Sequence, residues 1–167
     1  MHRLTVLVAA LSALLLSASA GAATHNLTAT LDGAQEGVVT PATGSATLIL
    51  DDVANTLDMS LTYTGLLTPL TNAHVHCCSL PPTPSGIIVP MVPPMTTGAT
   101  SGAFDNVFNL TPTQVTQILS GLSYINLHTV GFPAGEIRGQ IIPEPGTVAL
   151  LSLGLVGLAA VRRNERL

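Results

Sequence analysis

Residues 124–140 read YINLHTVGFPAGEIRGQ, two short alternating runs on either side of a turn rich in Gly and Pro. In each run, aliphatic and polar side chains point to opposite sides, as they do along a β-strand. The two runs are therefore expected to form neighbouring strands with one aliphatic and one polar face. The polar face would carry Tyr124, Asn126, His128, Glu136, Arg138 and Gln140.

The same alternation recurs upstream, at residues 26–31, 44–51, 56–64, 70–78 and 102–110. Residues 79–100 are rich in proline, which a central strand does not tolerate, so they are expected to form a long surface loop with at most a brief edge strand at 86–89. One helix is indicated after Thr111, where Pro112 and Gln114 complete a capping box. The pattern predicts an all-β, antiparallel sandwich or barrel of about seven or eight short strands with one short helix.

The sharpest chemical feature is a histidine pair, His74 and His76, which project from the same side of a strand together with Asn72. His128 on the polar face and Cys78 could complete a set of ligands suited to zinc or copper. The alternative is a polar cluster in which the imidazoles are hydrogen-bonded to neighbouring side chains such as Asn126, Glu136 and Tyr124. Spacing alone leaves both interpretations open.

The two cysteines, Cys77 and Cys78, are adjacent. Neighbours in an extended strand point to opposite faces, so a bond between them needs a strained ring. Two free thiols, one reactive thiol and an intermolecular bridge are the alternatives. Glu136 and Arg138 are expected to form an ion pair. No catalytic triad, nucleotide-binding loop or nucleophile motif is present, so the sequence names no catalytic residue.

Charge excludes one class of partner. Between the apolar ends, the chain contains seven acidic residues and a single arginine, Arg138, and the whole chain has no lysine. Nucleic-acid binding needs clustered Lys and Arg, so nucleic acid is not expected as a partner.

Both ends of the chain have the pattern of targeting segments. Residues 1–22 combine a basic start, an apolar run and small residues, as in a secretory signal peptide, with cleavage expected after Ala20 or Ala22 by signal peptidase. At the other end, Pro143, Glu144 and Pro145 precede an apolar segment at 147–161, expected to cross the membrane, and then Arg162 and Arg163.

Residues 143–167 resemble the PEP-CTERM sorting signal of Gram-negative bacteria. The resemblance implies processing by a membrane-embedded exosortase, first with a membrane tether on the periplasmic side and then at the cell surface or outside the cell. It also implies a bacterium that makes exopolysaccharide and a biofilm matrix, so that exopolysaccharide or another envelope component becomes a candidate partner. An ordinary C-terminal membrane anchor is the alternative.

Residues 23–142 resemble a CHRD (chordin-type) domain. The resemblance rests on Asn72-Ala73-His74-Val75-His76, on the stretch 124–140 and on the opening residues 31–36 and 44–47. It implies an immunoglobulin-like β-barrel with no established catalytic residues. Many such domains have glycine after the histidine pair, where this chain has Cys77 and Cys78. The sequence therefore predicts an exported, non-enzymatic binding or structural protein of the cell envelope, with metal binding, and so a redox role, as the alternative.

Overall fold

The structure, a computed structural model, describes residues 24–144, which form nine strands and one short helix. In chain order these elements are β1 (Thr24–Asp32), β2 (Thr43–Asp51), β3 (Thr56–Thr64), β4 (Leu70–Cys77), β5 (Gly86–Pro90), β6 (Gly102–Asn109), α2 (Pro112–Leu119), β7 (Tyr124–Thr129), β8 (Ile137–Gln140) and β9 (Ile142–Pro143).

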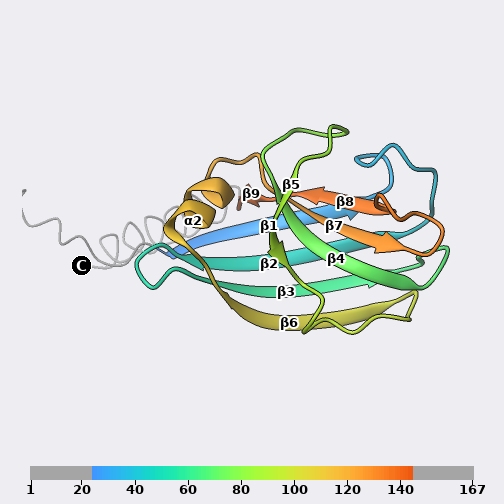
Figure 1. The fold of residues 1–167 in the computed structure, drawn as a ribbon, viewed down its shortest axis with the longest axis horizontal. Coiled ribbons are helices and arrows are strands. Elements are labelled where there is room, and N and C mark those ends of the chain that lie inside the picture. Colours follow the sequence, from blue (N-terminus) through green and yellow to red (C-terminus); the bar gives the residue numbers. More distant parts are fainter. Residues whose placement is uncertain (1–23, 145–167) are drawn as a thin grey trace, which may run out of the picture.

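The strands belong to a single sheet in the order β5-β4-β7-β8-β1-β2-β3-β6, with β9 paired to β1. Every pairing is antiparallel. The sheet curls into a half-barrel, so that β4 and β7 lie across β1, β2 and β3 (Figure 1). The prediction of an antiparallel all-β fold with one short helix is confirmed. The two-residue strand β9 takes the number of strands beyond the predicted seven or eight.

The core fills the inside of the curl, and the alternation in the sequence explains which side chains reach it. On β3, Leu57, Met59 and Leu61 are fully buried, whereas the residues between them are exposed. β1 and β2 follow the same rule, and Phe104 and Phe108 of β6 both point inward. Each large aliphatic side chain buried in this way contributes roughly 1.5–3 kcal/mol to folding.

The helix begins where the sequence predicts. The Thr111 side chain accepts a hydrogen bond from the backbone N–H of Gln114, and the Gln114 side chain accepts one from the backbone N–H of Thr111 at 2.7 Å. Gly121 follows the helix with a φ of 73°, a left-handed conformation that favours glycine. Val115 and Ile118 are the buried residues of the helix and join the hydrophobic core.

The strands β4, β7 and β8 place the predicted polar face. Their inward side chains, including Val75 and Ile125, join the core. On the outer side, the register sets His74 opposite Asn126, and Asn126 opposite Arg138. One row along, His76 lies opposite Tyr124, which in turn lies opposite Gln140. The two segments that the sequence linked only by resemblance are therefore neighbouring strands.

Within residues 24–144, no helix is long and apolar enough to cross a membrane. The expected signal peptide with Ala20 and Ala22, the expected membrane segment 147–161, Pro145, Arg162 and Arg163 lie outside the described residues.

Candidate metal centre

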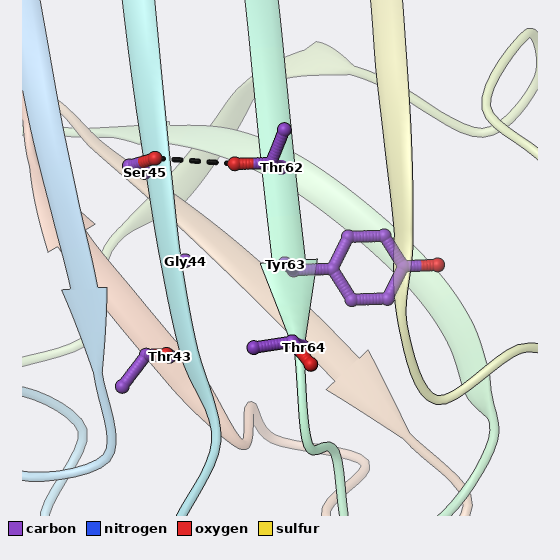
Figure 2. Close-up of a pocket in the computed structure, with 6 residues that line it drawn as sticks. All are labelled: Thr43, Gly44, Ser45, Thr62, Tyr63 and Thr64. Carbon is purple, nitrogen blue, oxygen red and sulfur yellow. Dashed lines mark hydrogen bonds between the residues drawn. The ribbon is translucent and has the colours of Figure 1, made fainter.

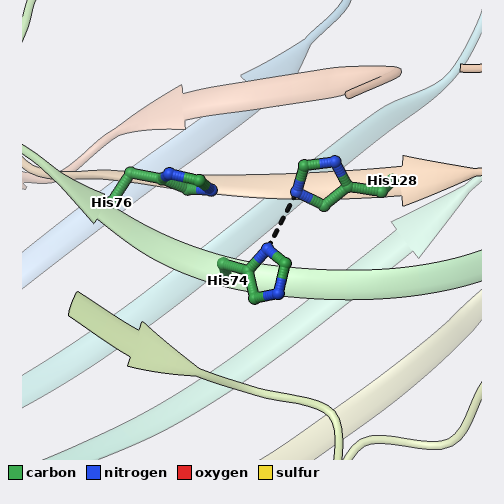
Figure 3. Close-up of side chains that lie close together, drawn as sticks. All are labelled: His74, His76 and His128. Atoms are coloured by element: carbon green, nitrogen blue, oxygen red, sulfur yellow. Dashed lines mark hydrogen bonds between the residues drawn. The ribbon is translucent and has the colours of Figure 1, made fainter. Parts of the chain in front are cut away.

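Three histidines meet on the outer side of β4 and β7. His74 and His76 come from β4 and His128 comes from β7, and one nitrogen from each ring lies within 4.8 Å of the others (Figure 3). His74 Nδ1 and His128 Nε2 are 3.0 Å apart. In a tetrahedral zinc site, nitrogens bound at about 2 Å are a little over 3 Å apart, so small side-chain movements would bring all three onto one ion.

Hydrogen bonds to backbone carbonyls determine which nitrogens of His76 and His128 carry the proton. His76 Nδ1 lies 2.8 Å from the carbonyl oxygen of Ser85, and His128 Nδ1 lies 3.1 Å from that of Pro133. A carbonyl only accepts, so both Nδ1 atoms carry the proton and both Nε2 atoms keep a lone pair. Second-shell bonds of this kind are typical of metal-binding histidines, because they fix the tautomer and the ring orientation.

The rings are expected to be neutral at neutral pH. Burial, followed by the nearby His74, lowers the pKa of His128 to about 4. Burial and the neighbouring His76 lower the pKa of His74, and burial is also the main cause that lowers the pKa of His76. A metal ion binds only the neutral imidazole, so these pKa shifts keep the three rings in the protonation state that binds a metal.

A surface loop covers the polar face. The Tyr124 hydroxyl accepts a hydrogen bond from the backbone N–H of Ser85 at 2.9 Å. The Arg138 guanidinium donates to the carbonyl oxygens of Thr83 at 2.8 Å and Ser79 at 2.9 Å, and Gln140 donates to Ser79 at 3.2 Å. The start of the proline-rich insertion is therefore fixed onto β7 and β8, and it supplies the carbonyl that orients His76.

A stack of three side chains connects β8 to the histidines. The Arg138 guanidinium carbon lies 3.3 Å from the centroid of the Tyr124 ring. The His76 ring also stacks on Tyr124, with centroids 4.9 Å apart and planes only 6° from parallel. The orientation of the His76 ring therefore depends on Tyr124 and Arg138, neither of which is a candidate metal ligand.

Glu36 is a member of this region that the sequence did not indicate. Burial raises the pKa of its carboxyl group, while the positive charge of Arg138 and the nearby Asn126 side chain act against that rise. It lies in the turn between β1 and β2, and its one sequence signal was an acidic residue within the opening residues 31–36. From the sequence, Glu36 is expected in a loop, and no periodic pattern there indicates the direction of its carboxylate.

Comparison with protein families identifies the fold and the end of the chain. The CHRD domain matches residues 27–141. The chain belongs to the CHRD family. A PEP-CTERM protein-sorting motif matches residues 142–163, directly after the domain. Comparison with curated proteins finds no match, and comparison with solved structures finds none either. The protein is thus an exported CHRD protein that bacteria sort through exosortase, with membrane anchoring during processing.

In this CHRD domain, Cys78 is bonded to Cys77 and does not join the histidine cluster. Cys77 and Cys78 form a disulfide with each other, across a cis peptide bond, and no free cysteine remains in the described part of the chain. β4 ends at Cys77, so the alternation of sides along a strand does not extend to Cys78. The alternatives drawn from the sequence, free thiols or an intermolecular bridge, are not what the structure contains.

Glu136 also departs from the expectation. Its carboxylate is fully buried and accepts hydrogen bonds from the Thr40 hydroxyl, the Leu67 backbone N–H and the Thr129 hydroxyl, at 2.7–2.8 Å. Between residues 24 and 144, the one ion pair joins His25 and Asp52, so the expected pair of Glu136 with Arg138 does not form. Glu136 lies before the first residue of β8, and it joins loops and the end of β7 instead of facing the histidines.

Of the remaining predicted residues, Asn126 lies beside the histidines and donates to the carbonyl oxygen of Ala134 at 3.2 Å. Asn72 lies opposite His128, and its side chain accepts from the backbone N–H of Ala73. Pro143 forms part of β9, and Glu144 donates its backbone N–H to Asn26.

An open pocket lies elsewhere, along β2 and β3 (Figure 2). Its lining consists of Thr43, Gly44, Ser45, Thr62, Tyr63 and Thr64. Ser45 and Thr62 share a hydrogen bond of 3.1 Å. These side chains include no carboxylate, imidazole or thiol, so the pocket has neither a metal-binding set nor an acid–base pair. The histidine cluster is the better candidate site.

Proposed function

We propose that this protein is a non-enzymatic metal-binding domain that is exported and sorted to the outside of the cell. The observation that carries the proposal is the approach of His74, His76 and His128, whose candidate ligand nitrogens lie within 4.8 Å of one another. Three neutral imidazoles suit Zn²⁺ or Cu²⁺ better than the hard cations Mg²⁺ and Ca²⁺, which prefer oxygen ligands.

Hydrogen bonds within the protein leave one nitrogen of the histidine cluster without a partner. His74 and His128 satisfy each other, but His76 Nε2 is buried and has no hydrogen-bond partner. Buried polar atoms without a partner are rare and call for an explanation, such as an ion or a water molecule. A metal ion would use that lone pair. A purely structural cluster would leave it unused, so this atom favours the metal over the competing structural interpretation.

The rest of the polar face supports binding over turnover. The Arg138 guanidinium is fixed to loop carbonyls, and the buried Glu136 carboxylate is fully engaged by three donors. Neither group is placed to exchange protons with a substrate at the histidines. We therefore assign this face a role in holding a ligand.

Metal analysis of the exported protein tests the proposal. Protein purified from the periplasm without chelators should contain about one equivalent of Zn or Cu. After chelation, adding the metal at a hundredfold excess over its dissociation constant should stabilise the fold by about 2.7 kcal/mol. Replacing any of the three histidines by alanine should abolish both effects.

His25→Ala is the matched control, because His25 lies on β1 and pairs with Asp52. This variant should bind metal as the wild type does. Absence of metal in the purified protein, together with an unchanged melting temperature on metal addition, would leave the structural interpretation in place.

The final location is the second part of the proposal. After sorting, we expect the domain at the cell surface or in the exopolysaccharide matrix of a Gram-negative bacterium, with exopolysaccharide as a partner. The PEP-CTERM motif at residues 142–163 supports this route. Fractionation of cells with and without exosortase tests it. Loss of the enzyme should keep the protein in the membrane fraction, and an unchanged distribution would contradict the proposal.

A further inference from the structure

Four buried polar atoms in residues 24–144 have no hydrogen-bond partner, and they lie on or against the same face. They are Glu36 Oε2, His76 Nε2, Asn126 Oδ1 and Arg138 Nε. The proposed metal accounts for the His76 nitrogen. Because native proteins leave few such atoms, the remaining ones point to something further that this face is built to hold.

The histidine cluster supplies only three protein ligands. No further His, Cys, Asp or Glu of the described residues belongs to it, and both cysteines are consumed in their disulfide. Sites with three protein ligands keep a fourth position for water or another small molecule, whereas structural zinc sites are closed by four. His74 is only partly buried, which gives this position a route to solvent.

Asn126 is next to two of the histidines in the sheet. It lies opposite His74 in the β4–β7 register and two residues before His128 on the same side of β7. The side chain is 3% exposed. Its Nδ2 donates to the carbonyl oxygen of Ala134, which identifies the other end of the amide as the oxygen. That oxygen accepts no hydrogen bond.

A metal-bound water molecule would supply the hydrogen-bond donor that Asn126 Oδ1 lacks. The metal polarises the water, which becomes a strong hydrogen-bond donor and needs an acceptor next to it. We infer that the metal at His74, His76 and His128 carries an exchangeable water as its fourth ligand, with Asn126 as the positioning residue that accepts its hydrogen bond. This inference rests on the proposed metal-binding function.

Cobalt substitution tests the inference, because the visible spectrum of Co²⁺ reports its coordination. Azide, a small anion that cannot donate a hydrogen bond, is the probe for the fourth position. In the Co²⁺-loaded wild-type protein, azide should change the spectrum in a saturable way as it replaces the water. A spectrum that does not respond to azide would show a closed site and overturn the inference.

Two variants of Asn126 should shift azide binding in opposite directions. Asn126→Leu removes the acceptor that favours water, and the loss of one hydrogen bond should tighten azide binding by about tenfold. Asn126→Asp keeps the acceptor and adds negative charge, so azide should bind about tenfold more weakly. Loss of packing alone would not produce this reversal.

Asn106→Leu, on β6 in the other half of the sheet, is the control and should leave the azide affinity unchanged. If Asn126→Leu does not fold, the comparison of Asn126→Asp with the wild type still decides. Equal azide affinities in the wild type and the Asn126 variants would remove Asn126 from the role. Cobalt content is measured separately: stoichiometric Co²⁺ without an azide response defeats this inference alone, whereas absence of Co²⁺ defeats the metal-binding proposal with it.

Discussion

The central carbon of the Arg138 guanidinium lies over the Tyr124 ring, 3.3 Å from the ring centroid. Both side chains are almost completely buried. A buried guanidinium needs several partners, and here it has an aromatic face on one side and two loop carbonyls at its end. This contact holds the loop that covers the polar face in place against β7 and β8.

Replacing Arg138 should therefore destabilise the whole domain. We expect Arg138→Met, which keeps the length of the side chain, to lower the free energy of unfolding by about 2–4 kcal/mol, since two charge-assisted hydrogen bonds and the stacking contact are lost. Arg138→Lys should recover only part of this, because an ammonium group lacks the planar fork. Urea unfolding measures both variants. Full recovery with lysine would mean that charge alone matters at this position.

Tyr124→Phe should weaken metal binding without changing a ligand. The Tyr124 hydroxyl holds the backbone N–H of Ser85, whose carbonyl oxygen orients His76. Losing such second-shell support should raise the metal dissociation constant about tenfold, measured by competition with a chromophoric chelator.

The chain has only one other tyrosine, Tyr63 on β3, so Tyr63→Phe is a matched control that should bind metal normally. Equal weakening in both variants would point to a general loss of stability and not to the orientation of His76.

Acid should destabilise the metal-free protein through its histidines. The pKa of His128 is about 4 in the folded protein, against 6.5 as its ordinary value. Folding thus favours the neutral ring. The contribution of His128 to stability is complete above about pH 6.5 and is lost as the pH falls towards 4, a loss of about 3 kcal/mol. The lowered pKa values of His74 and His76 act in the same direction.

Urea unfolding in the presence of a chelator, between pH 7.5 and pH 4, measures this loss. His128→Gln should show a smaller fall in stability than the wild type over the same range. Glu36→Gln should show a larger fall in stability than the wild type. The raised pKa of Glu36 means that its protonation in acid favours the folded protein, and the variant lacks this contribution. Parallel curves for the wild type and His128→Gln would contradict the prediction.

Glu136→Gln should cost about 2–3 kcal/mol of folding free energy. The carboxylate accepts three hydrogen bonds in a fully buried site, and an amide would turn an NH₂ group towards one of the donors. Asp58→Asn, the same chemical change on the exposed side of β3, is the control and should alter stability by less than about 0.5 kcal/mol. Thermal or urea unfolding compares the two variants, and equal losses would refute a special role for Glu136.

The sequence predicted the parts of this structure that local periodicity controls. Leu57, Met59 and Leu61 alternate with polar residues because one face of β3 is buried, and this signal is visible without any knowledge of neighbouring strands. The capping box at Thr111 is equally local. The histidines were placed on the correct faces for the same reason, since a strand fixes the side to which each residue points.

The sequence could not predict the contacts that loops make after the chain has folded back. Glu36 and Ser85 reach the polar face from turns whose path depends on the whole sheet, so no periodicity marks them. Glu136 is separated from Thr40 by 96 positions, and its burial follows from a loop contact. For Cys77 and Cys78, the alternation of sides predicts opposite faces only within a strand, and β4 ends at Cys77.

The strand β9 brings the sorting signal into direct contact with the folded domain. Ile142 and Pro143, within the PEP-CTERM match, pair with Thr28 and Leu27 of β1, and the backbone N–H of Glu144 donates to Asn26. The sorting motif thus begins immediately after the CHRD match, and its first two residues are part of the folded sheet. Processing close to Pro143 would therefore act on backbone that is already hydrogen-bonded to β1, and unpairing this two-residue strand would expose the motif.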